Sequence, residues 1–241
     1  MLEKKIHNCI LEIINEREEK VKSSEEDSFG NDFLGLLLKA HHDNSDSQTI
    51  SVDDLVEECK TFYFAGQETT NTLLGWTVFL LAIHIDWQEE VRKEVLNLFG
   101  RENPNPDSIA KLKLMGMVFN ESMRLYPPVI GFERKVEREV RVGELILPAN
   151  LNLIFSTLAL HHDPHIWGED VNQFKPERFS ERVSEATKIN STAFFPFGMG
   201  PRNCVWSNFV GFLEQKTQQN ERERSLNWCG LNTLVHYRHS I

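Results

Sequence analysis

Cys204 has the most distinctive chemical setting in the sequence, at the end of the run Phe197-Gly-Met-Gly-Pro-Arg-Asn-Cys204. A thiolate is a strong metal ligand, but it needs N–H donors that stabilise its charge. The glycines of the run permit a tight loop that aims backbone N–H groups at the sulfur. Arg202 in the same loop offers a guanidinium to an anion. The alternative is a buried free thiol beside a turn, which is the default interpretation of the other three cysteines.

A second group with chemical potential is the segment Ala65-Gly-Gln-Glu-Thr-Thr70, which lies between Phe62-Tyr-Phe64 and two leucines. Gly66 removes a side chain where a bound group could approach the helix. The Thr69 hydroxyl can bond back into its own helix or hold a water molecule, which would open the helix locally. Glu68 is an acid that could relay protons. The alternative is a polar patch on an amphipathic helix, although it would interrupt an apolar face.

Charged residues at helical spacing form a third group. Glu121 and Arg124 are three residues apart, so their side chains can pair on one helical face. Taken alone, such a pair is usually exposed and contributes less than about 1 kcal/mol. Arg178, in the later segment Pro176-Glu-Arg-Phe179, could join the pair in a buried network.

Four segments follow one another along the chain: Ala65 to Thr70, Glu121 to Arg124, Pro176 to Phe179, and Phe197 to Cys204. Together and in this chain order they resemble the cytochrome P450 family, the haem-thiolate monooxygenases, from about Ser51 to Phe209. The cysteine loop is the most specific signal, whereas Glu-x-x-Arg alone is weak. The resemblance implies that Cys204 is the metal ligand of a haem, whose iron it would activate toward cleavage of the O–O bond. It also implies that Glu68 and Thr69 are the catalytic pair that delivers protons to bound dioxygen.

The resemblance assigns roles to further residues. Two arginines, Arg202 and Arg134, would hold the haem propionates, although Arg138 or Arg141 could compete with Arg134. Glu121, Arg124 and Arg178 would form a structural network that locks the cysteine loop. His161 to Trp167 would be a structural turn, which leaves zinc binding by His161, His162 and His165 improbable. The loop residues Phe197 and Gly200 would also contact the haem, and an apolar substrate pocket would be lined by Phe62, Phe64, Ala65, Val129 and Ile130, for which core packing is an equal explanation.

By this resemblance the function is insertion of one oxygen atom of O2 into a hydrophobic small molecule, terpenoid-like or hormone-like. Electrons would come from NADPH through a flavin-containing reductase. The sequence around Glu121-Ser-Met-Arg-Leu-Tyr-Pro-Pro128 is similar to plant members. Two alternatives remain, a catalytically inactive haem-binding fragment and a reductase-independent haem-thiolate isomerase or dehydratase. The acid–alcohol pair at 68 and 69 favours the monooxygenase over the isomerase.

Composition narrows the class of partner. The 241 residues carry a net charge of −10 with scattered basic residues, which argues against nucleic acid. The four cysteines form no CxxC pattern, which favours a reducing compartment. The segment from Thr69 to Ile85 contains no formally charged residue, but we expect a buried helix there rather than a membrane span. The chain itself is expected to be soluble and without an anchor, while the family resemblance points to the endoplasmic reticulum membrane.

The elements that must position these residues are mostly helical. Apolar spacing predicts helices over 1–20 and 33–38, a long helix that opens with a capping box at Ser51 and Asp54, and helices over 87–99 and 108–126. A hairpin over 136–147 would turn at Gly143-Glu144. The expected fold is therefore mainly α with a small β portion, a partial cytochrome P450 fold with a long central distal helix, a Glu-x-x-Arg helix and a cysteine ligand loop.

The sequence also departs from the family pattern. We expect residues 1–209 to form a partial haem-binding monooxygenase domain, truncated because the match begins partway through the family fold. Trp206 stands where the family has a glycine, and its indole would crowd the start of the next helix. Residues 210–241 are expected to form a divergent, disordered tail, as an altered splice junction or reading frame would produce.

Overall fold

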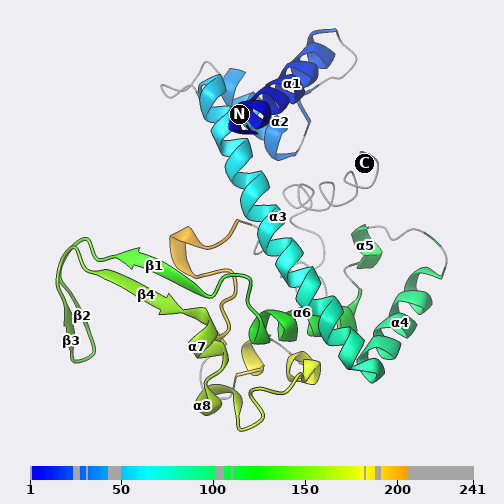
Figure 1. The fold of residues 1–241 in the computed structure, drawn as a ribbon, viewed down its shortest axis with the longest axis vertical. Helices are drawn as coiled ribbons and strands as arrows, with labels where there is room; N and C mark the ends of the chain where they lie inside the picture. Colours follow the sequence, from blue (N-terminus) through cyan, green and yellow to red (C-terminus); the bar gives the residue numbers. More distant parts are fainter. Residues whose placement is uncertain are drawn as a thin grey trace. The chain divides into compact units, whose positions relative to one another are not determined.

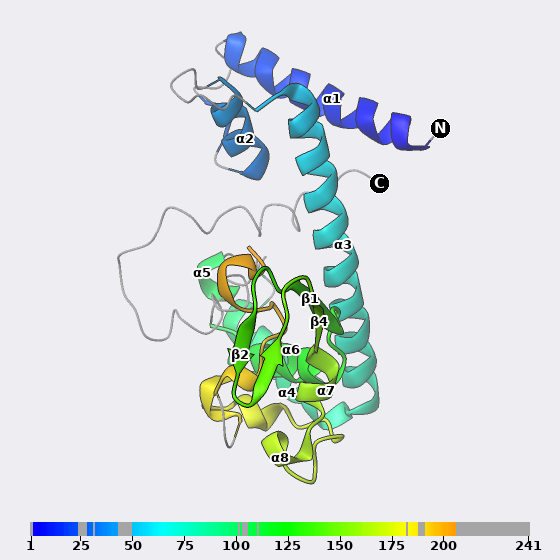
Figure 2. The same ribbon diagram turned by 90° about the vertical axis from the view of Figure 1, so that its left-hand side faces the viewer.

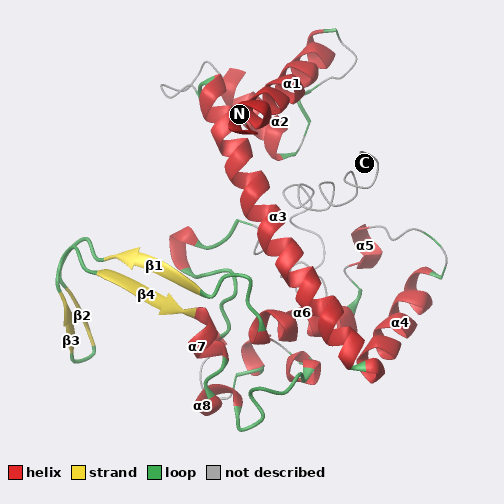
Figure 3. Ribbon diagram, viewed as in Figure 1, coloured by secondary structure: helices red, strands yellow, loops and turns green. Residues whose placement is uncertain are grey.

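The computed structural model describes residues 2–23, 28–30, 32–42, 50–100, 102, 106–109, 111–181, 183–187 and 191–205. Trp206 and the predicted tail 210–241 lie outside the described residues. The chain divides into two compact units whose boundary falls between Glu68 and Thr69, inside one long helix. Each unit is described by itself. The structure is mainly helical with a small β portion, as predicted (Figure 3).

The first unit consists of α1 (Leu2–Lys22), α2 (Phe33–His42) and the N-terminal part of α3 (Val52–Ile83) (Figures 1 and 2). Its core is formed by four apolar side chains that are almost completely buried, Ile14, Leu38, Leu55 and Val56. The predicted capping box begins α3, because the Asp54 N–H donates to the Ser51 hydroxyl and the Ser51 N–H donates to the Asp54 carboxylate, each at 3.1 Å. The Ser51 hydroxyl also donates to the Asp54 carboxylate at 2.6 Å, and this hydrogen bond, together with that from the Ser51 N–H, lowers the pKa of Asp54.

The second unit contains the rest of α3, then α4 (Ile85–Phe99), α5 (Pro106–Ile109) and α6 (Lys113–Leu125). Later in the chain come two short helices, α7 (Thr157–His161) and α8 (Pro164–Trp167), and several 3-10 turns. α4 ends at Gly100, whose φ of +59° fits its predicted place after the helix. One hydrophobic core joins α3, α4 and α6 through Leu80, Val91, Val118, Leu125 and Phe174.

The β portion consists of two antiparallel strand pairs in the second unit. β1 (Gly131–Lys135) pairs with β4 (Asn152–Ser156), and β2 (Val140–Val142) pairs with β3 (Leu145–Leu147). The second pair is the predicted hairpin, with Val142 opposite Leu145 and the turn at Gly143 and Glu144. The first pair places Phe132 opposite Phe155 and was not predicted, since the hairpin of β2 and β3 separates its strands in the sequence.

Several features differ from the prediction. The helix expected over 108–126 is interrupted, because α5 ends at Ile109 and α6 begins only at Lys113, after the buried Leu112. The long helix ends at Ile83, where His84 separates it from α4. The prediction that the helix over 69–85 is buried is wrong: Thr77 and Leu80 are buried, but Val78, Phe79 and Ile83 are exposed. A helix is buried on all sides only where other residues pack against every face, and the described residues pack against one face of this segment.

A search of the described helices finds none whose length and hydropathy would suffice for crossing a bilayer.

Candidate functional site

The loop that carries Cys204 is closed by backbone hydrogen bonds. The Cys204 N–H donates to the Phe197 carbonyl at 2.8 Å, and the Gly198 N–H donates to the Phe195 carbonyl at 3.0 Å. A short 3-10 turn, Gly200–Arg202, lies between them and ends where Asn203 N–H donates to the Gly200 carbonyl at 3.1 Å. The loop therefore presents a half-buried free thiol on a tightly constrained backbone.

Two glycines permit this path. Gly198 and Gly200 have φ values of +76° and +81°, in the region that L side chains rarely adopt. A Cβ at Gly198 would also lie 3.4 Å from the Phe132 ring, so the loop passes close to β1 at this point. Around Gly200 there is open space, and its requirement for glycine is conformational alone.

One arginine lies beside an aromatic contact between β1 and the loop, and a second arginine lies in the loop itself. The Phe132 ring in β1 lies 6.0 Å from the Phe195 ring at the start of the loop. The Arg134 guanidinium lies 6.0 Å from the Phe132 ring centroid and donates to the Glu133 carbonyl at 2.8 Å. Arg202 is exposed in the cysteine loop. Neither Arg134 nor Arg202 forms an ion pair with a carboxylate among the described residues, so both guanidiniums can serve a bound anion.

The structure brings Glu121, Arg124 and Arg178 into one network. Arg124 donates to both carboxylate oxygens of Glu121, at 2.7 and 2.8 Å, and both side chains are 0% exposed. Arg178 adds a longer ion pair, with its Nε 3.5 Å from the same carboxylate. The backbone N–H of Lys175 donates to Glu121 at 2.9 Å. Burial raises the pKa of Glu121, and the two arginines and this N–H oppose the increase.

Asp170 is a further member of this network that the sequence reasoning missed. Its carboxylate lies 2.7 Å from the Arg178 guanidinium and 2.7 Å from the Lys175 ammonium. Hydrogen bonds from Lys175 and Arg178 hold the pKa of Asp170 well below its usual range. Arg178 also donates to the Trp167 and Asp170 carbonyls at 3.0 and 2.6 Å. No short sequence pattern marks Asp170, because its role depends on how the segment after α8 folds back.

His161 connects the network to the cysteine loop. Arg124 donates to the His161 carbonyl at 3.0 Å, and the Phe195 N–H donates to His161 Nε2 at 3.3 Å. The imidazole is 0% exposed and packs against the rings of Trp167 and Phe194. Burial, with a smaller contribution from nearby Arg124, lowers the pKa of His161 to about 4. Neutral His161 therefore links α7 to the segment that leads into the loop, a role that the sequence reasoning did not identify.

The neighbouring histidines, His162 and His165, lie at the ends of helices. His162 lies 2.9 Å from the Leu125 carbonyl, at the end of α6. His165 is exposed at the start of α8, whose N-cap is formed by the Asp163 carboxylate.

Glu68 and Thr69 lie inside α3, which is α-helical throughout Val52–Ile83. Glu68 is exposed and Thr69 is half-buried. The predicted apolar pocket residues divide between the units, with Phe62, Phe64 and Ala65 in the first and Val129 and Ile130 in the second. Phe62 stacks on Phe33 of α2 at 3.7 Å, a contact that fits the packing interpretation. Phe64 and Ile130 are 72% and 66% exposed, and Val129 is half-buried.

The residues of the second unit fit a haem group. A half-buried thiol lies on a constrained loop, and guanidiniums without carboxylate partners among the described residues lie in this loop and in β1, against which the loop packs. The thiol is suited to an iron ion, and the guanidiniums are suited to the haem propionates. Behind the loop, the buried network joins it to α6 through His161.

Comparison with known proteins gives consistent matches. A family model described as Cytochrome P450 matches residues 1–209. Cytochrome P450 CYP749A22 from Panax ginseng is 57% identical over 210 residues, which are 87% of this chain and 40% of that protein. An 11-oxo-beta-amyrin 30-oxidase from Glycyrrhiza uralensis is 43% identical, and a 7-deoxyloganic acid hydroxylase from Catharanthus roseus is 42% identical; each match covers 89% of this chain and 42% of the relative. The chain thus spans about two fifths of the length of these curated relatives.

Proposed function

This chain belongs to the cytochrome P450 family, and from that premise we propose that it supplies the haem-thiolate site of a monooxygenase. The substrate would be a hydrophobic small molecule of terpenoid type, since one relative is named for oxidation of an oxo-amyrin and another for hydroxylation of deoxyloganic acid. The observation that carries the proposal is the Cys204 loop, with its thiol on a backbone closed at 2.8 Å and a connection to the buried network.

In this proposal Cys204 would supply the thiolate that binds the haem iron. Bound haem supplies the activation of dioxygen, with electrons from NADPH through a flavin-containing reductase, and a thiolate ligand favours O–O cleavage. Arg134 and Arg202 would neutralise the propionates, because neither has a carboxylate partner in the described part of the chain. Phe197 and Gly200 shape the loop, Phe197 by accepting the Cys204 N–H and Gly200 by its positive φ.

The network keeps the thiol in place. Glu121 and Arg124 are fully buried, and breaking such a pair costs about 3–5 kcal/mol because a buried charge loses its main partner. Arg124 reaches the loop through His161 and the Phe195 N–H. A shift of His161 would therefore move the start of the loop, so the network positions Cys204.

Glu68 and Thr69 would move protons. Glu68 is exposed, so its carboxyl group can exchange protons with solvent, and the adjacent Thr69 hydroxyl can pass them on through a water. The apolar side chains Phe62, Phe64, Ala65, Val129 and Ile130 would line the substrate site. This part of the proposal rests on the position of these residues within the family pattern.

The test is the carbon monoxide spectrum of the reduced, haem-supplied chain. Thiolate ligation gives the red-shifted Soret band, and the Cys204→Ser variant must lose it, while Cys9→Ser, at an exposed cysteine of the first unit, must keep it. Turnover of a terpenoid with reductase and NADPH separates the monooxygenase from an inactive haem-binding fragment. Conversion of a hydroperoxide without reductase would instead identify the isomerase or dehydratase.

A further inference from the structure

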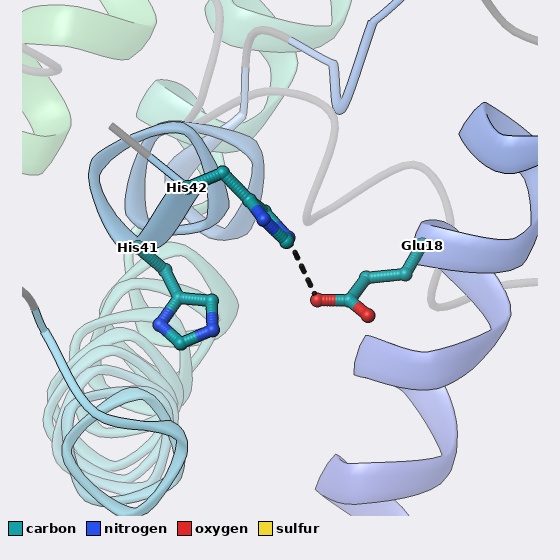
Figure 4. A group of neighbouring side chains, drawn as sticks. All are labelled: Glu18, His41 and His42. Carbon is teal, nitrogen blue, oxygen red and sulfur yellow. Dashed lines mark hydrogen bonds and ion pairs between the residues drawn. The ribbon is translucent and has the colours of Figure 1, made fainter. Parts of the chain in front are cut away.

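A second group of ligand-type side chains lies in the first unit and takes no part in the haem proposal. Glu18 projects from α1, and His41 and His42 are the last two residues of α2. One ligand atom from each residue, a carboxylate oxygen or a ring nitrogen, lies within 4.8 Å of the others. Figure 4 shows the His42 and Glu18 side chains facing each other from the two helices, with the His41 ring on the same side of α2 as His42.

His41 has the hydrogen bond that is typical of a metal-ligating histidine. Its Nδ1 lies 2.5 Å from the Ile50 carbonyl oxygen. Because a carbonyl can only accept, Nδ1 must carry the hydrogen, and the Nε2 lone pair is then available. Ligating histidines nearly always donate their second N–H to a carbonyl, carboxylate or water, which fixes the tautomer and raises the basicity of the coordinating nitrogen.

His42 and Glu18 are held in place by their surroundings. The His42 ring stacks on Phe29 with a centroid distance of 4.9 Å and an interplanar angle of 5°. Its Nε2 lies 2.9 Å from Glu18 Oε1, and the Glu18 side chain is only 16% exposed. A carboxylate oxygen thus lies beside two imidazole rings.

We propose that Glu18, His41 and His42 bind a divalent transition-metal cation, with Zn2+ as the best match, and that the cation clamps α1 to α2. Two imidazoles and one carboxylate, with water in the fourth position, are an established zinc ligand set, whereas Mg2+ and Ca2+ prefer oxygen ligands alone. Zinc bonds of about 2.0–2.2 Å place tetrahedral ligand atoms roughly 3.5 Å apart, so the side chains close in by rotation.

Substitution of Lys22 should change the affinity of the proposed site for the cation. Its ammonium lies 3.2 Å from Glu18 Oε2, the carboxylate oxygen opposite the one that faces His42, and the lysine is 70% exposed. A positive charge at this position repels a bound cation. Lys22→Gln should therefore tighten metal binding while leaving the three ligands in place.

The experiment uses the full chain with Cys9→Ser as background, because an exposed thiol on α1 would bind zinc adventitiously. The protein is freed of metal with a chelator, titrated with ZnCl2 by calorimetry, and titrated with Co2+ to record the visible bands of a tetrahedral site. We expect one Zn2+ per chain at this site, at least about a tenfold loss of affinity in His41→Gln and Glu18→Gln, and a gain in Lys22→Gln. Mg2+ should give no comparable heat.

The matched control is His7→Gln, a histidine of α1 outside the cluster. Far-UV circular dichroism establishes that each variant folds. His41→Gln removes a ligand but leaves the Glu18–His42 hydrogen bond in place, so it tests metal binding even if Glu18→Gln loosens the contact between α1 and α2. Absence of zinc binding would overturn the proposal. Equal affinity in the His7→Gln and His41→Gln variants would overturn it as well, because binding would then lie elsewhere. Haem binding is measured separately and should be unchanged in all of them.

Discussion

Replacement of Arg124 by methionine tests the buried network against a control that the chain itself provides. Arg92 follows Glu89 with the same Glu-x-x-Arg spacing on a helix, but those side chains are 59% and 47% exposed and lie 3.4 Å apart. Arg124 is 0% exposed, makes two hydrogen bonds with Glu121 and donates to the carbonyls of His161 and Gln173 at 3.0 and 3.3 Å. The same pattern should therefore have different energetic weights at the two positions.

The expected free energies follow from burial. Arg124→Met leaves the Glu121 charge and two carbonyls without this donor, so the free energy of unfolding should fall by about 3–5 kcal/mol. Arg92→Met should change it by less than about 1 kcal/mol. The double variant Glu121→Gln/Arg124→Met should recover part of the loss, because the unpaired buried charge is gone.

Urea unfolding followed by circular dichroism measures the total effect, and amide hydrogen exchange in α6 localises it. If Arg124→Met proves as mild as Arg92→Met, burial does not give the pair its weight and the argument fails. If the double variant is less stable than Arg124→Met alone, the uncompensated charge is not the source of the loss.

Three further predictions concern other parts of the chain. Burial lowers the pKa of His161 to about 4, so the folded state favours the neutral imidazole. The contribution of His161 to the free energy of unfolding should be fully present above about pH 6.5 and should decrease by about 3 kcal/mol as the pH falls to about 4. Urea unfolding at several pH values measures this decrease, and His161→Phe should remove it. Ser51→Ala should cost the first unit about 1 kcal/mol by chemical unfolding, since the cap with Asp54 is lost; no loss would contradict its role. Gly198→Ala should cost about 1–2 kcal/mol and lower haem incorporation, whereas Gly75→Ala, in an open position on α3, should do neither.

The sequence predicted best what depends on local chemistry. The capping box at Ser51, the end of α4 at Gly100 and the hairpin turn at Gly143 each require particular residues within a few positions, and the structure has them. The spacing of Glu121 and Arg124 likewise indicated a helical pair.

Contacts between distant segments could not be predicted in the same way. Nothing in the local pattern separates the buried pair at 121 and 124 from the exposed pair at 89 and 92. His161 was assigned only to a turn, because its partners Arg124 and Phe195 are 37 and 34 residues away in the chain. Asp170 was missed although Arg178 is only 8 residues away, because their contact depends on how the segment after α8 folds back.

The apolar periodicity of the sequence does not reveal where the helices are interrupted. Apolar spacing continues from Ser108 to Tyr126, yet α6 begins only after Leu112, which is buried. The exposed apolar side chains on α3 illustrate a related limit: hydropathy predicted burial, but burial depends on what packs against the helix.

The most direct test of the central claim is the carbon monoxide difference spectrum of the reduced chain, recorded beside its Cys204→Ser variant. We predict the red-shifted Soret band of a thiolate ligand in the parent chain and its loss in the variant. Amide hydrogen exchange in α6 should be the same in both proteins, because the substitution leaves the buried network in place. A folded parent chain that takes up haem without this band, or a Cys204→Ser variant that retains it, would contradict the assignment of Cys204 as the haem ligand.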